Sequence, residues 1–558
     1  MCRTRKREKN KGRSTPGEGG SKHAGKEGCS MSETIENRIN AAETAPKTEY
    51  TKRMERKFGF FGPATFLYAA FYAFCMVRNS AGVSFPFFMA GSLLYMCFCL
   101  SKLEISLKKG SIWYMTGMML LAVSTFCTDD LKIVNLNKTG IFLLMMSLLL
   151  KQFYDTSKWR LGKYLGSIVM MVFGSLGEVG RPFADFGAYL KEDGRNKNKK
   201  LWSVLLGVVI ALPLLFVAAA LLGSADAVFR QMTKAFFDRI QPANICNVLF
   251  RILFLFFASY LLLAFLCRHT LKEEVRDGRT WEPIPAMVVT GMLSLLYLFF
   301  SGVQIFGLFL QKLALPEGYT YAEYAREGFF QLLAVSILNL VIVLCVMSFV
   351  KKSRGLQIIL TVMSLCTFVM IASSAMRMVI YIRCYDLTFL RIFVLWALAV
   401  LFVLFVGVII NIFREGFPLF RYSVGVVTVL YLMLSFSHPD YLIARVNLAK
   451  AQESLQTAES TVDYDYLSTL STDAAPVLLP YLKQLGYDLS LYTEEDILAF
   501  GTWEENAEGN WQPSWNAEGF GWYYLNQIRP RLEKMSPRTY NISRHMALQL
   551  LEKYGADV

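Results

Sequence analysis

Long apolar runs separated by short polar stretches fill the chain between residues 58 and 437. A bilayer core about 30 Å thick is crossed by about 20 helical residues, and most of these runs approach that length. Such lengths favour membrane-spanning helices over buried strands, which are much shorter. We predict about eleven spans, with ten to twelve possible. The predicted spans are 58–77, 83–100, 111–128, 139–150, 201–223, 247–267, 284–311, 328–350, 356–376, 389–413 and 418–437.

The composition agrees with this pattern. The chain has 558 residues, of which 54% are hydrophobic and 18% charged, whereas a soluble chain carries about 25% charged residues. The cysteines and the four histidines show no metal-ligand spacing. The predicted fold class is therefore an all-α, polytopic integral membrane helical bundle, and we expect no metal and no cofactor.

Polar segments flank the apolar region on both sides. Residues 1–57 are basic and lack apolar periodicity, which is typical of a disordered cytoplasmic tail. Residues 438–558 mix charged and aromatic residues and carry a net negative charge, and Leu467–Leu485 and Ser543–Tyr554 show helical spacing. We therefore expect a small, mostly helical, soluble and acidic C-terminal domain. Residues 58–200 form the N-terminal membrane helices in this division, and residues 201–437 form a membrane core.

The segment 164–180 decides the predicted topology. If it does not span, the loops on the same side of the membrane as the N-terminus hold 21 Lys and Arg residues, and the loops on the other side hold 10. If it spans, the counts become 14 and 17, and the bias disappears. Because basic loops stay on the cytoplasmic side, we predict that 164–180 is an interfacial or re-entrant helix. The N-terminus is then cytoplasmic and the C-terminal domain lies outside.

The net charge of +14 has a simple explanation in these basic loops. No soluble segment alternates basic and aromatic residues as nucleic-acid-binding proteins do, so we expect no nucleic-acid partner. The expected partners are the lipid bilayer and either another membrane protein or a small solute.

Several polar residues collect on the predicted outer side. The functional interpretation is a polar cavity in which Arg377 pairs with Glu327, Asp386 or Asp226, because arginine in a membrane helix is costly and usually has a partner. The alternative is an ordinary interfacial belt, where arginine extends to the headgroups and tyrosine lies at their level. The candidate binding residues are Asp226, Glu323, Arg326, Glu327, Gln331, Arg377, Tyr381, Tyr385 and Arg391.

Enzyme signatures are missing from the sequence. It contains no phosphate-binding P-loop, no HExxH helix and no GxSxG elbow. Asp463-Tyr464-Asp465 resembles the paired acids of metal-dependent sugar transferases, but such triplets are common by chance. Asp129-Asp130, in a short loop, suggests no function. We therefore lean towards a protein that is not an enzyme.

Several longer motifs carry a family resemblance. They are Gly223–Phe229, Tyr321–Leu332, Arg377–Tyr381 with Leu387–Arg391, Ile443-Ala444-Arg445 with Asn447, and Tyr466–Leu479. The chain resembles, over about residues 200–480, the bacterial polytopic membrane proteins of domain of unknown function 4173, which is close to the family numbered 4153. The resemblance implies a multi-pass protein of the bacterial inner membrane and brings no established activity.

Three hypotheses for the function remain open. The first is a membrane-embedded sensor, regulator or accessory subunit with an external domain. The second is a secondary transporter of a small solute, although the sequence shows no clear two-half repeat. The third is a membrane enzyme acting on lipid or envelope precursors, with Glu327, Asp226 or His438 as acid or base.

Overall fold

The structure is a computed structural model of the chain. It describes residues 48–156, 161–192, 242–269, 280–306, 328–414, 416–454, 462–484, 501–505, 511–515 and 517–555, with a few single residues between them. Contacts divide the chain into residues 1–49 and 50–558, and the second unit contains all the membrane helices. Most of the predicted N-terminal tail lies outside the described residues.

Within these ranges, nine helices are long and apolar enough to cross a membrane. They are α3 (Phe58–Met76), α4 (Ser84–Leu103), α6 (Leu131–Phe153), α11 (Pro242–Arg268), α12 (Pro283–Gln304), α14 (Phe329–Phe349), α15 (Arg354–Cys384), α16 (Phe389–Phe413) and α17 (Leu419–Phe436). The apolar α5 (Ser111–Cys127) is slightly shorter. These ten helices correspond to ten predicted spans, and the remaining one, 201–223, lies outside the described residues. The prediction of an all-α polytopic protein is confirmed, and the chain is a multi-pass membrane protein.

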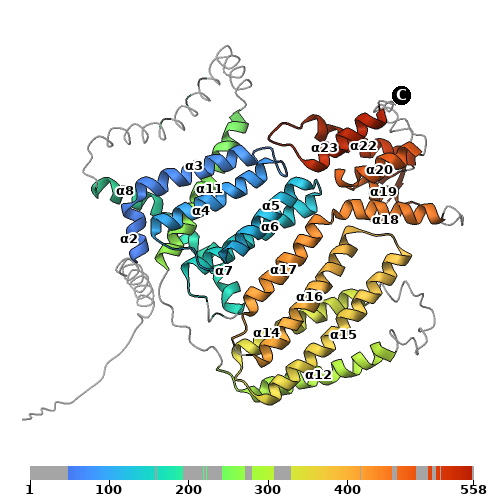
Figure 1. The fold of residues 1–558 in the computed structure, drawn as a ribbon, viewed down its shortest axis with the longest axis horizontal. Helices are drawn as coiled ribbons and strands as arrows, with labels where there is room; N and C mark the ends of the chain where they lie inside the picture. The colour runs from blue at the N-terminus through green and yellow to red at the C-terminus, as the bar shows by residue number, and fades with distance from the viewer. Residues whose placement is uncertain are drawn as a thin grey trace, which may run out of the picture. The chain divides into compact units, whose positions relative to one another are not determined.

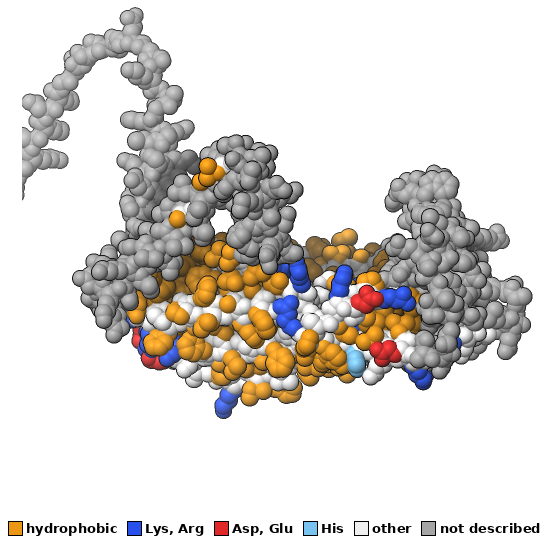
Figure 2. Space-filling model, turned by 90° about the horizontal axis from the view of Figure 1, so that it is seen from above, with side chains coloured by type: hydrophobic (Ala, Val, Ile, Leu, Met, Phe, Trp, Pro, Cys, Tyr) orange, Lys and Arg blue, Asp and Glu red, His pale blue; other side chains and the backbone are white. Residues whose placement is uncertain are grey.

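Large apolar side chains on the outer faces of these helices agree with a lipid environment. Trp113 is 80% exposed, Phe299 74% and Ile284 70%. Hydrophobic side chains cover much of the described surface in Figure 2. Water would oppose so much exposed apolar area, whereas lipid accepts it.

Neighbouring helices pack in two groups. The first joins α3, α4, α5, α6 and α11 with the short helix α7 (Leu161–Ser175), and the second joins α12, α14, α15 and α16. α17 lies between them, because it packs against α16 on one side and α5 on the other, as Figure 1 also shows. α7 is followed by η1 (Leu176–Glu178) and α8 (Arg181–Glu192). It packs against α11, and its interfacial placement stays a prediction.

A buried amide fastens α6 to its neighbours in the first group. Asn137 accepts hydrogen bonds from Tyr431 Oη at 2.8 Å and from Ser435 Oγ at 2.7 Å, and its amide donates to Thr125 Oγ1 at 3.1 Å. The partners come from α17 and α5. One asparagine therefore joins three helices where no water could satisfy its amide.

Three boundaries differ from the sequence prediction. The helix α2 (Glu49–Arg56) falls within the predicted tail, and it is folded because Met54 is buried and Arg53 Nη1 donates to Leu103 O at 2.9 Å. α6 begins at Leu131, eight residues earlier than predicted, because Asp130 caps it. α15 continues to Cys384 through most of the predicted loop 377–388. Its 31 residues measure about 46 Å, longer than the bilayer core.

The C-terminal part packs against the ends of the membrane helices. It comprises α18 (Pro439–Ser454), α19 (Tyr464–Ser468), η3 (Thr472–Ala474), α20 (Ala475–Gln484), β1 (Gly501–Glu505), β2 (Trp511–Trp515), α22 (Ala517–Glu533) and α23 (Ile542–Gly555). α20, α22 and α23 enclose an apolar core that Phe389 and Ile392 of α16 join. α18 contacts α16, and α23 contacts α5. The predicted helical character is correct, apart from the antiparallel hairpin of β1 and β2. Because this core also contacts α16, the C-terminal part is joined to a membrane helix, and its soluble, acidic character stays a prediction.

Candidate functional site

A three-residue turn joins α5 to α6 and presents two adjacent acids. Thr128 is the C-cap of α5 and Asp130 the N-cap of α6. Asp130 Oδ1 accepts the backbone N–H of Lys132 at 2.8 Å, which is the usual way an aspartate begins a helix. The turn is short because the two caps follow one another, so Asp129 is held between two helix ends.

The C-terminal part clamps this turn from the opposite side. Asp473 Oδ1 accepts the N–H of Asp129 at 2.9 Å, and Asp473 Oδ2 accepts the hydroxyl of Thr128. In return, Asp129 Oδ1 accepts from Arg544 Nε at 2.9 Å and Nη2 at 2.7 Å, and Arg531 Nη1 lies 3.3 Å from Oδ2. The turn is therefore bound through both its backbone and its side chain.

Two further acids are buried beside this clamp. Asp130 is 2% exposed and Asp440, in the first turn of α18, is 1% exposed. Asp440 Oδ2 accepts the N–H of Ser471 at 2.8 Å. Within the described residues, the other oxygen of each carboxylate, Asp130 Oδ2 and Asp440 Oδ1, has no hydrogen-bond partner. We call Asp129, Asp130, Asp440 and Asp473 the carboxylate cluster.

Burial and the repulsion between neighbouring carboxylates shift the pKa values of the acids in the cluster. Burial, followed by the charge of Asp440, raises the pKa of the Asp130 carboxyl to about 7. Burial also raises the pKa of Asp440. For Asp473, burial opposes ionisation, but hydrogen bonds led by that of His438 outweigh it and lower its pKa. The cluster thus combines one ionised anchor with a pair that favours a shared proton.

His438 connects the cluster to the junction between α17 and α18. Its Nδ1 lies 3.1 Å from Asp473 Oδ2, and this hydrogen bond raises the pKa of the imidazole against the opposing effect of burial. Its backbone is left-handed, with φ of +47°, a conformation that costs a non-glycine residue roughly 1 kcal/mol. The junction between α17 and α18 is thus held by a strained residue whose side chain makes a titratable contact.

The loop between α3 and α4 completes the attachment. Asn541 Nδ2 donates to Ala81 O at 2.8 Å and to Thr128 O at 2.9 Å, and Val83 N donates to Tyr540 O at 2.7 Å. Within the described ranges, no three acid, histidine or cysteine side chains are arranged to hold a metal ion. The arrangement can bind and release protons while it holds the C-terminal part in place.

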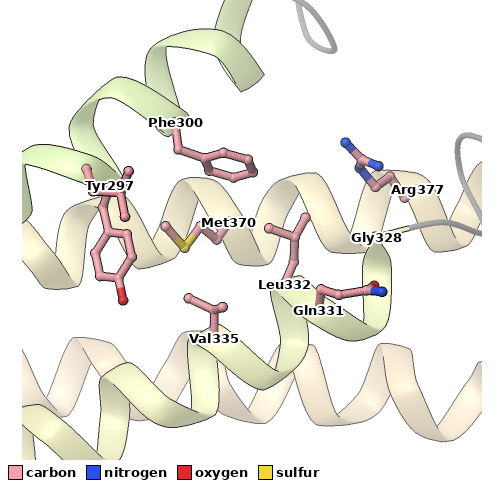
Figure 3. Close-up of a pocket in the computed structure, with 9 residues that line it drawn as sticks. Tyr297, Phe300, Gly328, Gln331, Leu332, Val335, Met370 and Arg377 are labelled. Carbon is pink, nitrogen blue, oxygen red and sulfur yellow. The ribbon is translucent and has the colours of Figure 1, made fainter. Parts of the chain in front are cut away.

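Four of the nine sequence-predicted polar residues line two separate cavities away from this cluster. Arg377 and Gln331 line a cavity of about 370 Å³ between α12, α14 and α15, shown in Figure 3. We call it the Arg377 cavity. Its remaining lining residues are Leu296, Tyr297, Phe300, Gly328, Leu332, Val335 and Met370.

Tyr385 and Arg391 line a second, more polar pocket of about 470 Å³, next to α18 and α19. Tyr381 stands near both residues, because the Arg391 guanidinium lies 4.3 Å above its ring and the Tyr385 ring centroid is 4.8 Å away. Asp386, a predicted partner of Arg377, forms an ion pair with Lys450 at 3.2 Å. The other predicted residues, Asp226, Glu323, Arg326 and Glu327, lie outside the described residues.

Comparison with known protein families covers most of the membrane helices and part of the C-terminal part. Residues 115–481 match the family described as domain of unknown function (DUF4153). This chain belongs to the DUF4153 family. The match confirms the resemblance seen in the motifs and extends it towards the N-terminus, to include α5 and α6. No curated protein and no solved structure matches the chain.

The DUF4153 region contains all four acids of the carboxylate cluster and both cavities. Arg531 and Arg544 lie beyond its end at residue 481. The sequence indicates His438 only as a candidate acid or base of a membrane enzyme, and it assigns no function to Asp129-Asp130 or to Asp440. The available signal was a pair of acids directly between two apolar runs. Nothing in the local sequence indicated that Asp129 has a partner, Asp473, more than 340 residues away.

Proposed function

We propose that this protein is a membrane sensor or regulator, in which the C-terminal part docks on the membrane helices while the Asp130–Asp440 pair holds a proton and loosens when the pair loses it. The observation that carries the proposal is the buried pair Asp130 and Asp440. The pair lies between a membrane helix and the C-terminal part, and each carboxylate has one oxygen without a described partner. Two ionised carboxylates in such a site repel each other and lack water.

The direction of the response follows from proton linkage. Because docking raises the pKa of the Asp130–Asp440 pair, the docked state binds more protons, and its stability falls as the pH rises from about 4 towards 7. The raised pKa of His438 acts in the same sense, because its contribution is complete below its ordinary value and is lost as the pH rises further. The lowered pKa of Asp473 gives a contribution that is lost only in strong acid. Docking should therefore be strongest near pH 4, weaken through pH 5 to 7, and be weakest above pH 7.

Other charged and titratable groups face the pair without reversing this direction. The Lys132 cation favours ionisation, whereas the Asp473 charge opposes it, and burial remains the largest influence. Groups that interact with the pair are Lys132 on α6, Tyr431 on α17, Tyr466 on α19, Asp473 on η3 and Tyr524 on α22.

The proposed setting is the bacterial inner membrane, with the N-terminus in the cytoplasm and the C-terminal part outside. The loop charges support this orientation. In that orientation the cluster would face the external side, and its protonation would follow external acidity. The proposed partner is a second membrane protein that recognises either the docked or the loosened C-terminal part.

Hydrogen exchange on the full-length protein in lipid nanodiscs tests the proposal. After correction for the intrinsic effect of pH on exchange, amides of α18, η3 and α20 should lose protection between pH 5 and pH 8. The double variant Asp130→Asn/Asp440→Asn should remove most of this dependence and leave the smaller part that comes from His438. Asp386→Asn is the matched control, because it removes an acid of the neighbouring polar pocket that is paired with Lys450, and it should leave the dependence intact.

A cellular experiment separates sensing from simple stability. The double variant should accumulate normally and should fail to reproduce the response of the wild-type strain to an alkaline shift. If amide protection in the wild type did not change with pH, docking of the C-terminal part would not depend on protonation of the Asp130–Asp440 pair. An unchanged cellular response in the double variant would contradict the sensing role.

A further inference from the structure

The Arg377 cavity is apolar along most of its length and polar at one end. Figure 3 shows Tyr297, Phe300, Met370 and Val335 along the cavity, and Arg377, Gly328 and Gln331 together at its other end. The apolar walls come from α12, α14 and α15. A cavity with this division suits a molecule with an apolar chain and a charged head.

Contacts with α12 and α15 hold the cation at the polar end. Arg377 is 6% exposed, and its Nη2 donates to Gln304 Oε1 at 3.4 Å. The hydroxyl of Ser373 donates to the same oxygen at 2.7 Å, so the amide that receives Arg377 is itself held in place. Planar guanidinium groups bind carboxylates through two parallel hydrogen bonds.

Gly328 leaves the space that the guanidinium occupies. Its φ is +124°, and an added Cβ would lie 3.0 Å from Arg377 Nη1. A side chain at this position would therefore be strained and would also press on the cation. The start of α14 is thus shaped to let Arg377 reach the cavity.

The depth of Arg377 fits the head of a membrane lipid. It lies seven residues before the end of α15 at Cys384, a rise of about 10 Å. If α15 is centred on the bilayer core, this position lies close to the boundary between the core and the headgroups. Leu296 on the α12 wall is 59% exposed, so the wall also faces the surroundings of the bundle.

We infer that the Arg377 cavity binds a long-chain fatty acid, with the carboxylate at Arg377 and the alkyl chain between α12, α14 and α15. The volume of about 370 Å³ lies near the lower limit of small-molecule sites, which favours one chain over the two chains of a phospholipid. This inference is independent of the carboxylate cluster.

Photocrosslinking of the full-length protein in nanodiscs tests the inference. A palmitate analogue carrying a diazirine in its chain should label peptides within residues 283–304, 328–349 and 354–384. Unlabelled palmitate should compete, whereas hexadecanol, which has the same chain without the charge, should compete poorly. Arg377→Gln should weaken palmitate binding about tenfold or more, since it removes a charge-assisted hydrogen bond.

Two further variants separate binding from folding. Arg383→Gln removes an exposed arginine of the same helix, and it should bind as the wild type does. Val335→Phe fills the apolar part and should reduce labelling even if Arg377→Gln fails to fold. The inference is overturned if hexadecanol competes as well as palmitate, if Val335→Phe labels like the wild type, or if a diacyl phospholipid blocks labelling where palmitate does not.

Discussion

Replacement of Asp440 by asparagine should change docking of the C-terminal part at alkaline pH and leave it almost unchanged in acid. The amide oxygen of asparagine can still accept the N–H of Ser471, which Asp440 Oδ2 accepts at 2.8 Å. The amide nitrogen then takes the place of Oδ1, which has no described partner, and brings no negative charge near Asp130. The variant therefore imitates the protonated acid at every pH.

The size of the effect follows from the raised pKa of the pair. The pKa of Asp130 rises from 3.8 to about 7, and one pKa unit corresponds to about 1.4 kcal/mol. The full pKa shift of Asp130 therefore corresponds to about 4 kcal/mol, which is an upper limit for the change in docking free energy. Burial causes the larger share of this shift, and the substitution does not remove that burial. We therefore expect Asp440→Asn to strengthen docking by about 1–2 kcal/mol at pH 8. At pH 5, where the pair shares a proton, the change should stay within about 0.5 kcal/mol.

The assay is native-state hydrogen exchange of the η3 and α20 amides, which gives the free energy of local opening at each pH. Asp440→Ala is the comparison, because it deprives the Ser471 N–H of its acceptor. That variant should weaken docking by about 1–2 kcal/mol at pH 5. At pH 8 the loss should be smaller, because alanine also removes the charge that repels Asp130. If Asp440→Asn weakened docking equally at pH 5 and pH 8, the two acids would not share a proton and the reasoning would fail.

Three other predictions concern the attachment and the helix packing. Arg544→Ala should destabilise docking by about 2–3 kcal/mol, because a buried carboxylate loses two hydrogen bonds, and Arg544→Lys should restore part of the loss in a thermal unfolding assay. Gly82→Ala should expose the C-terminal part to limited proteolysis, because the added Cβ would lie 2.6 Å from a backbone atom of that part, whereas Gly180→Ala, with nothing within 4 Å of the added atom, should not. Asn137→Ala should cost about 1–2 kcal/mol in denaturant unfolding in detergent, through the lost hydrogen bonds to α5 and α17; an unchanged midpoint would show that those bonds contribute nothing.

The sequence predicts the membrane character of this chain well, because a membrane span requires only a sufficiently long apolar run within one short segment. Each span needs about 20 apolar residues, and the run from Phe389 to Phe413 shows its length whatever the rest of the chain does. The ends of some helices were harder to predict, because they depend on a capping side chain or on extension of the helix beyond the apolar run. The cap at Asp130 extends α6, and α15 continues past Arg377 to Cys384 without a break.

The candidate sites were only partly accessible from the sequence. Gln331 and Arg377 do line one cavity, as their placement beside apolar runs suggested. Tyr385 and Arg391 belong to another, because α15 ends between Arg377 and these residues. Spacing along the chain cannot separate the two, since it carries no information about which neighbouring helix covers each position.

The sequence by itself determined the apolar spans, the family and the helical nature of the C-terminal part, all of which rest on composition and on patterns within short segments. Only the tertiary structure decided that Asp129 meets Arg544, 415 residues away along the chain, and that Asp130 and Asp440 are buried together. Burial and pairing turn a short acidic turn into a group that can hold a proton near neutral pH, because the missing water and the neighbouring charge raise its pKa. Neither condition is a property of the residues themselves.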